Sequence, residues 1–292
     1  MADKNENTVS APEAVLVLVV LVGVWFMIFA NGNFSKDGGN RPLFGKEEAF
    51  SQTAVLSVHF GNLGPELVSS GVIDREKFIK LYDGNDSLKK EAQKLLDGTD
   101  NGDFVVTEEN ALVVLNFLWA FGLGNKNPIL ERGPMTDPRY GGAGNFASTG
   151  GWTLARGDAI EHYSMHRFIV LSPEEQDLVE RVSKNIYRPC CDNSTYFPDC
   201  NHGMAMLGFL ELLASQGAGE EEMYKAALTL NAYWFPGTYE VITQYMEEKG
   251  VRRENISPKE ILGKNHSSVS GFRNISSQIK NKGQSGGSSC GI

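Results

Sequence analysis

Features that would identify a reaction are scarce in this sequence. Only 4 of its 292 residues are cysteines, too few to staple the whole fold by disulfides, so we expect them to serve one local purpose. The formal net charge of -9 excludes a general nucleic-acid-binding protein, because phosphate backbones require a basic surface. No signature in the chain defines a substrate. What the sequence does contain is one long apolar run, a series of helical patterns and one loop rich in cysteine.

The apolar run near the N-terminus predicts a membrane anchor. Residues 14–30 read AVLVLVVLVGVWFMIFA, and as an uncharged helix they are just long enough to cross a hydrocarbon core of roughly 30 Å. A cleaved signal peptide normally has a basic start and a shorter apolar core, whereas Lys4 is the one basic residue ahead of this run. A buried helix of a soluble domain is a further alternative. We predict an uncleaved signal-anchor, a single-pass transmembrane helix, with the membrane and other membrane-complex subunits as partners.

The side of the membrane depends on two opposing considerations. Lys36, Arg41 and Lys46 follow the anchor, which by the positive-inside rule favours a cytoplasmic domain. Long domains, however, translocate largely regardless of flanking charge, and a long domain after an N-terminal anchor is commonly exported. On balance we expect the soluble domain on the extracytoplasmic side, where clustered cysteines can oxidise.

Beyond the anchor, apolar residues recur at spacings of three and four, which indicates amphipathic helices. Alternating strand patterns are almost absent, so the predicted fold class is all-α, an irregular helical bundle preceded by one transmembrane helix. Helices are predicted at Glu47–Ser57, Asp74–Tyr82, Ser87–Leu96, Glu108–Phe121, Asp158–Phe168, Pro173–Tyr187, Gly203–Ser215, Glu220–Trp234 and Thr238–Lys249.

The predicted domain order follows from composition. It runs from an N-terminal tail at 1–13 and the anchor at 14–30 to a flexible linker at 31–45, a helical soluble domain at 46–262 and a mobile, basic Ser/Gly-rich tail at 263–292. Within the domain, residues 124–156 are rich in Gly and Pro, and Trp152 there predicts packing rather than disorder.

Three of the four cysteines lie in one loop between two predicted helices. Cys190, Cys191 and Cys200 are joined there by His202, at the expected start of Gly203–Ser215. Thiolate and imidazole ligands suit zinc, copper and iron–sulfur centres, and the partial positive charge of a helix N-terminus favours a thiolate. The loop therefore predicts a metal-binding site or thiol redox chemistry.

Two other interpretations of these cysteines remain open. In an oxidising compartment Cys190 or Cys191 can pair with Cys200, which closes a short loop and stabilises it by roughly 2–3 kcal/mol. The thiols can also be packed as small hydrophobic groups. Under the disulfide interpretation the protein is a non-catalytic cell-envelope or membrane-complex subunit whose cysteine loop is a structural clasp.

Part of the loop resembles the CDGSH iron–sulfur family. Cys191, Ser194, Pro198 and Cys200 reproduce the Cys-x-x-Ser-x-x-x-Pro-x-Cys core of its signature, followed by a histidine. That family has Cys-x-Cys where this chain has two adjacent cysteines, and its histidine follows four residues after the last cysteine rather than two. The resemblance covers this loop alone and implies an iron–sulfur cluster in a small strand-rich fold.

Two histidines are further metal-ligand candidates. Asp158, His162 and His166 follow one another at intervals of four, so a helix would place them on one face, where two imidazoles can chelate one metal. His162 and His166 would reach the cysteine loop if the intervening helix packs back against it. Taken alone, the pair is more typical of solvated or hydrogen-bonded histidines.

A calcium site is predicted between two helices, at residues 97–108. Relative to the EF-hand loop, Asp97 holds the first position, Asn101 the fifth and Glu108 the twelfth, where a bidentate ligand is needed. Asp103 supplies another carboxylate, whereas Thr99 is a poor substitute at the third position. A capped Asp/Gly-rich turn is the alternative, and any calcium bound here would be structural.

Overall fold

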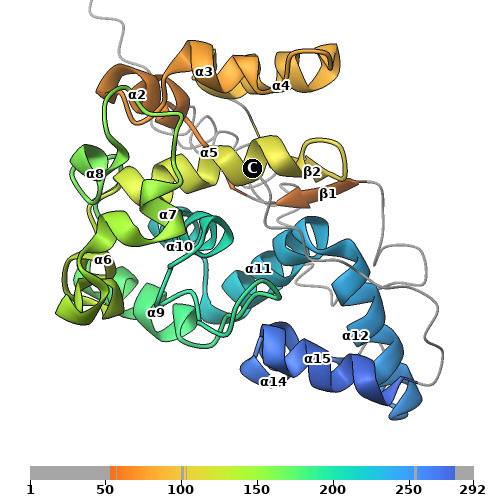
Figure 1. Cartoon of the computed structure of the whole chain (residues 1–292). Helices are drawn as coiled ribbons and strands as arrows, with labels where there is room; N and C mark the ends of the chain where they lie inside the picture. The colour runs from red at the N-terminus through yellow and green to blue at the C-terminus, as the bar shows by residue number, and fades with distance from the viewer. Residues whose placement is uncertain (1–52, 57, 100–101, 103, 253–254, 280–292) are drawn as a thin grey trace, which may run out of the picture. The chain divides into compact units, whose positions relative to one another are not determined.

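The computed structural model describes residues 53–56, 58–99, 102, 104–252 and 255–279 (Figure 1). Every described residue belongs to one compact unit of the chain. The anchor predicted at 14–30 and the linker at 31–45 lie outside the described residues, so both stay predictions. In the part of the chain that is described, no helix is both long and apolar enough to cross a membrane.

Two helices that are buried on almost every side form the centre of the described fold. Helix α5 (Ala111–Gly124) packs against α10 (Asn201–Ser215) and crosses it (Figure 1). Their backbones meet at two glycines: a Cβ atom on Gly122 would lie 2.1 Å from the carbonyl oxygen of Met204, and one on Gly208 would lie 2.8 Å from the nitrogen of Gly122. The missing side chains are what allow this close approach. The start of α10 carries the cysteine loop, so this crossing positions the candidate site.

Replacing Gly122 with Ala is therefore expected to destabilise the fold. The added methyl group would meet helix backbone, which cannot move aside as a flexible side chain can, and overpacking of this kind costs about 2–3 kcal/mol. Gly237→Ala is the matched control, since a Cβ atom there has no neighbour within 4 Å. Urea denaturation should show a lower midpoint for the first variant only, and equal midpoints would refute the close crossing.

The other helices and a small sheet surround the central pair. On one side of α5 lie α2, α3 and α4, while α9 and α11 pack against α10, and α12 is covered by α15 (Figure 1). A two-stranded antiparallel sheet pairs β1 with β2. The bounds are β1 Thr53–Leu56, α2 Leu63–Ser70, α3 Arg75–Lys80, α4 Asp86–Asp97, β2 Phe104–Thr107, α9 Pro173–Ser183, α11 Glu220–Trp234, α12 Pro236–Glu248, α13 Pro258–Ile261, α14 Lys264–Ser267 and α15 Val269–Gln278.

The described residues are mostly helical, which confirms the all-α prediction at the level of fold class. The helix predicted at Glu47–Ser57 is wrong over Thr53–Leu56, which forms β1 and pairs Val55 with Val105 of β2. β-Branched residues favour a strand when a partner is available, and the partner here lies about fifty residues away in the sequence. Local periodicity does not reveal such a pairing.

The predicted mobile tail is also corrected in part. From Lys264 to Gln278 the chain forms α14 and α15, and α15 packs on α12. Ile275 and Ile279 are buried and Phe272 is partly buried, so an apolar stripe at helical spacing is present among the serines. Residues 280–292 lie outside the described part of the chain.

The Gly- and Pro-rich stretch 124–156 is packed, as predicted. It folds into α6 (Pro128–Arg132), α7 (Ala147–Gly150) and three 3-10 turns at Pro134–Thr136, Pro138–Tyr140 and Ala143–Asn145. The ring of Trp152 meets that of Trp119 edge-on at 4.9 Å between centroids, and its Nε1 donates to the carbonyl oxygen of Val72 at 2.8 Å. The stretch thereby covers one side of α5.

Candidate metal centre

The cysteine loop folds back on itself between α9 and α10. Its backbone closes through an isolated bridge between Tyr187 and Ser194, and through a hydrogen bond from Thr195 N to Ile186 O at 2.8 Å. Cys200 is the N-cap residue of α10, and its sulfur accepts a hydrogen bond from Gly203 N at 3.4 Å. This local fold brings residues 190–191 against residues 199–202.

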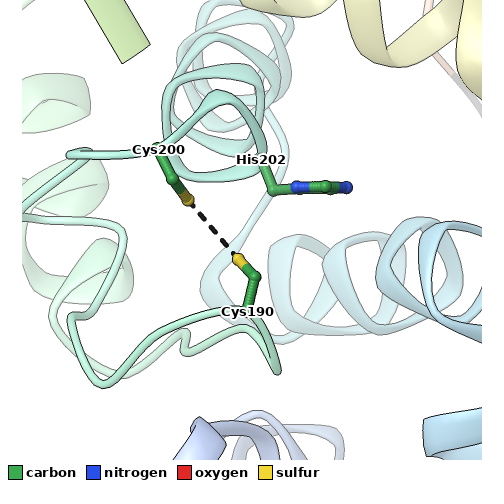
Figure 2. Close-up of side chains that lie close together, drawn as sticks. All are labelled: Cys190, Cys200 and His202. Atoms are coloured by element: carbon green, nitrogen blue, oxygen red, sulfur yellow. Dashed lines mark hydrogen bonds between the residues drawn. The ribbon is translucent and has the colours of Figure 1, made fainter. Parts of the chain in front are cut away.

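Three predicted ligands lie together at the start of α10. The sulfur atoms of Cys190 and Cys200 face each other at 3.5 Å, with His202 beside them (Figure 2). One potential ligand atom from each of these three residues lies within 4.8 Å of the other two. Among the described residues, no disulfide joins any two of the three loop cysteines. This Cys/His cluster can hold a metal ion, which supports that part of the sequence prediction.

Cys191 belongs to a second group on the same loop. Its sulfur, a carboxylate oxygen of Asp199 and the sulfur of Cys200 also lie within 4.8 Å of one another. The adjacent cysteines therefore point to different neighbours, and Cys200 is common to both groups. Asp199 was not predicted as a ligand, although it directly precedes Cys200 in the sequence.

The imidazole of His202 is buried, and within the described part of the chain its Nδ1 has no hydrogen-bond partner. It packs against Trp234 and Phe235, with ring centroids 5.6 and 4.5 Å away. Burial lowers the pKa of His202 to about 4, so the ring is neutral at physiological pH and keeps a lone pair. A buried polar atom without a partner is the kind of group that an ion or a water satisfies.

Arg188 lies beneath the sulfur atoms and is 1% exposed. Its Nε donates to the sulfur of Cys200 at 3.1 Å, and its Nη2 donates to Asp199 Oδ1 at 2.7 Å. Two further bonds reach backbone carbonyls, from Nη1 to Asn193 at 2.9 Å and from Nη2 to Phe197 at 3.1 Å. The guanidinium group therefore fixes the shape of the loop and holds a positive charge against Cys200.

Gly203 provides the space for this arginine. A Cβ atom at Gly203 would lie 2.3 Å from Nη2 of Arg188. Arg188, Asp199 and Gly203 were all missed as site residues by sequence reasoning. An arginine two positions before paired cysteines, and a glycine right after His202, were the available signals, but each is also common in ordinary loops and helix starts.

The electrostatics of the loop favour the thiolate form of Cys200. Hydrogen bonds from Cys190 and Cys191 hold the pKa of Cys200 well below the usual value, and the charge of Arg188 contributes in the same direction. For Cys191, contact with Cys190 lowers the pKa, but contact with Cys200 and burial together raise it to about 12. Burial raises the pKa of Asp199, although Arg188 opposes this. Of the loop sulfurs, that of Cys200 therefore favours the thiolate form.

The two histidines before the loop meet each other rather than the cysteines. The helix predicted at Asp158–Phe168 is present only as α8 (Ala159–His162) and is wrong beyond it, where Ser164 takes a left-handed conformation with φ 54°. His162 Nδ1 still lies 3.1 Å from His166 Nε2, and His162 Nε2 lies 2.9 Å from the carbonyl oxygen of Arg156. Among the described residues, neither histidine joins the ligand groups around Cys200.

The calcium prediction is only partly covered by the described residues. The carboxylate of Asp97 accepts two hydrogen bonds from Arg75, at 2.8 and 2.6 Å. Glu108 is exposed just after β2, while Asn101 and Asp103 lie outside the described part of the chain. Asp97 is thus already paired with a cation, and calcium binding here stays a prediction.

Comparison with known proteins gives no match to a protein-family model, a curated protein or a solved structure. The mostly helical surroundings of Cys190–His202 also differ from the small strand-rich fold that the CDGSH resemblance implies. A function must therefore be argued from the chemistry of the site itself.

Proposed function

We propose that this chain binds a zinc ion through the sulfurs of Cys190 and Cys200 and the imidazole of His202, on a helical domain tethered to a membrane by residues 14–30. The observation that carries the proposal is the convergence of three ligand atoms within 4.8 Å, one of them from a buried imidazole whose Nδ1 has no hydrogen-bond partner among the described residues. Sulfur and imidazole nitrogen are the two ligand types that protein zinc sites use most.

The spacing of the sulfur atoms suits one shared ion. In a tetrahedral site with zinc–sulfur bonds of roughly 2.3 Å, two sulfur ligands stand about 3.8 Å apart. Cys190 Sγ and Cys200 Sγ are separated by 3.5 Å, so a small outward shift of either side chain admits the ion. The two sulfur atoms therefore already lie close to the separation that a shared zinc ion requires.

The charges of the site favour a divalent ion. Arg188 and Asp199 form an ion pair at 2.7 Å and offset each other. The thiolates of Cys190 and Cys200 then carry two negative charges. A zinc ion neutralises both, whereas a cuprous ion neutralises only one. Uncompensated charge in a partly buried loop is costly. An iron–sulfur cluster is less suited, because it takes four protein ligands and the group around His202 supplies three.

Three protein ligands leave the fourth zinc position open. Closed structural zinc sites use four protein ligands, whereas sites that bind water or exchange a ligand use three. We therefore propose an exchangeable position at this centre, available to water or to a small ligand. This is the part of the proposal that allows either a reaction or a metal-delivery role.

Zinc titration against a competing chelator tests the proposal. The full chain, purified with reductant, is expected to bind zinc, and His202→Asn is expected to weaken that binding about 100-fold or more because a first ligand is lost. His59→Asn, at an exposed position, is the matched control and should bind like the wild type. Zinc binding that is absent in the wild type, or unchanged by His202→Asn, would contradict the proposed site.

A disulfide between Cys190 and Cys200 is the second candidate function of this loop. The observation in its favour is the same 3.5 Å separation, because closure to about 2.0 Å requires only a small movement of the two side chains. The chain would then be a membrane-complex subunit with a structural clasp, or a thiol redox protein. Mass spectrometry of the denatured, metal-free chain isolated without reductant distinguishes the two candidates, since the disulfide interpretation predicts a loss of two hydrogen atoms, that is two protons and two electrons, across Cys190 and Cys200.

A further inference from the structure

The two ligand groups of the loop share a single atom, the sulfur of Cys200. The geometry points to a second metal ion on the other side of this sulfur, held by Cys191, Asp199 and Cys200, with the Cys200 thiolate bridging both ions. This inference rests on the proposed zinc site and extends it from one ion to two. Two-metal sites in proteins hold their ions about 3.5–4 Å apart, a spacing that one shared ligand atom allows.

The adjacent cysteines supply one ligand to each ion. Cys190 lies against Cys200 and His202, whereas the sulfur of Cys191 lies 3.9 Å from Asp199 Oδ1. Cys190 and Cys191 belong to different groups of ligand atoms that lie within 4.8 Å of one another, although the two side chains also contact each other. Two ions on either side of Cys200 would use both groups, whereas a single ion would use one of them.

Asp199 is held in the manner of a metal-ligating carboxylate. Its Oδ1 accepts from Arg188 at 2.7 Å and its Oδ2 accepts from Asn193 Nδ2 at 2.7 Å. Each carboxylate oxygen has two lone pairs, so Oδ2 keeps one for a metal, and Oδ1 regains one when a metal replaces the proton that the Cys191 thiol donates to it. Hydrogen bonds of this kind orient the side chains that bind the metal directly in metal sites. The carboxylate of Asp199 is therefore held in one orientation and can still bind a metal.

The charge of the loop sets the order of binding. With one zinc ion on Cys190, Cys200 and His202, two thiolates offset the charge of the ion and the pair Arg188–Asp199 is balanced. A second zinc ion replaces the proton of Cys191 by a zinc–sulfur bond, releases that proton to solvent and leaves one net positive charge. The second ion is thus expected to bind more weakly than the first, and to fill only after it.

Cadmium substitution followed by native mass spectrometry and ¹¹³Cd NMR tests this inference. The reduced full chain loaded with Cd²⁺ alone is expected to hold two ions in the loop and to give two coupled ¹¹³Cd signals, because a bridging thiolate transmits coupling. Cys191→Ser should lose one ion and the coupling. Cys290→Ser, the matched substitution of the fourth cysteine, should keep both. The coupling in the wild type does not depend on any variant being folded.

The outcomes separate this inference from the proposed zinc site. One ion in the wild type and one in Cys191→Ser would overturn the second site and keep the first. One ion in the wild type and none in Cys191→Ser would place Cys191 in a single centre and also overturn it. Two ions that persist in Cys191→Ser, or that are lost in Cys290→Ser, would put the second ion elsewhere. No ion in the wild type would overturn both proposals.

Discussion

Replacing Cys200 with Ser is expected to abolish zinc binding, with a loss of affinity of about 1,000-fold or more, because a hydroxyl is a poor ligand for this ion. The effect should exceed that of any other single substitution in the loop, since Cys200 belongs to both ligand groups. The fold should survive. Cys200 is the N-cap residue of α10, and serine is among the best N-cap residues.

Chelator competition on folded protein measures this loss. Circular dichroism should show unchanged helix content in Cys200→Ser, which separates loss of a ligand from loss of structure. Cys191→Ser is the matched substitution in the same loop and should keep the first zinc ion. Zinc affinity that is equal in Cys200→Ser and the wild type would rule out Cys200 as the shared ligand.

Protein stability is expected to fall as the pH rises from about 5 to about 8, because of Glu211. This glutamate sits in the middle of α10, fully buried, and burial raises its pKa from 4.5 to about 8. Its carboxyl group accepts hydrogen bonds from the side-chain amides of Asn125 and Asn127, and no cation pairs with it in the described structure. The side chain is therefore held in the protonated form at neutral pH.

The sign of the effect follows from linkage. The folded state binds the Glu211 proton more tightly than the unfolded state, so stability is fully present below pH 4.5 and is lost as the pH rises through about 8. Each unit of pKa difference corresponds to about 1.4 kcal/mol, so the loss over this range is on the order of a few kcal/mol. Above about pH 8 Glu211 is ionised in both the folded and the unfolded state, so it causes no further loss of stability.

Glu211→Gln removes the titrating group and should flatten this dependence. Urea denaturation at pH 5, 7 and 9 is expected to show a smaller decline in the free energy of unfolding for the variant than for the wild type. Glu240→Gln, at an exposed position on α12, is the control and should keep the wild-type slope. A wild-type slope in Glu211→Gln would show that other groups cause the decline.

The cysteine loop was predictable because its chemistry is local in the sequence. Cys190, Cys200 and His202 lie within one connection, and the start of α10 follows from the apolar pattern after Gly203. Their convergence needed the backbone bridge between Tyr187 and Ser194, which no periodicity encodes. Residue type thus identified the ligands, while the fold of the loop decided which of them meet.

The supporting residues were harder to predict because they act through packing. Arg188 reads as an exposed charge in the sequence, yet its guanidinium group turns inward, where Gly203 leaves it room. His162 and His166 were predicted to meet across a helical turn. They do meet, but through a left-handed turn at Ser164. The spacing of the two histidines therefore predicted their contact correctly, although the backbone between them is not the predicted helix.

Errors in the fold have a similar cause. Thr53–Leu56 joined a strand whose partner lies far along the chain, and tertiary pairing overrode the helical spacing. In α15, serine-rich composition concealed an apolar stripe that Ile275 and Ile279 share with Phe272. Composition averages over a segment, whereas packing uses only one face of it.

X-ray absorption at the zinc edge tests the central claim most directly. The full chain, purified with reductant and loaded with zinc, is expected to show both sulfur neighbours at about 2.3 Å and nitrogen or oxygen neighbours at about 2.0–2.1 Å. Cys200→Ser should lose this signal. A zinc environment without sulfur, or a chain that takes up no zinc and carries a disulfide between Cys190 and Cys200, would contradict the account.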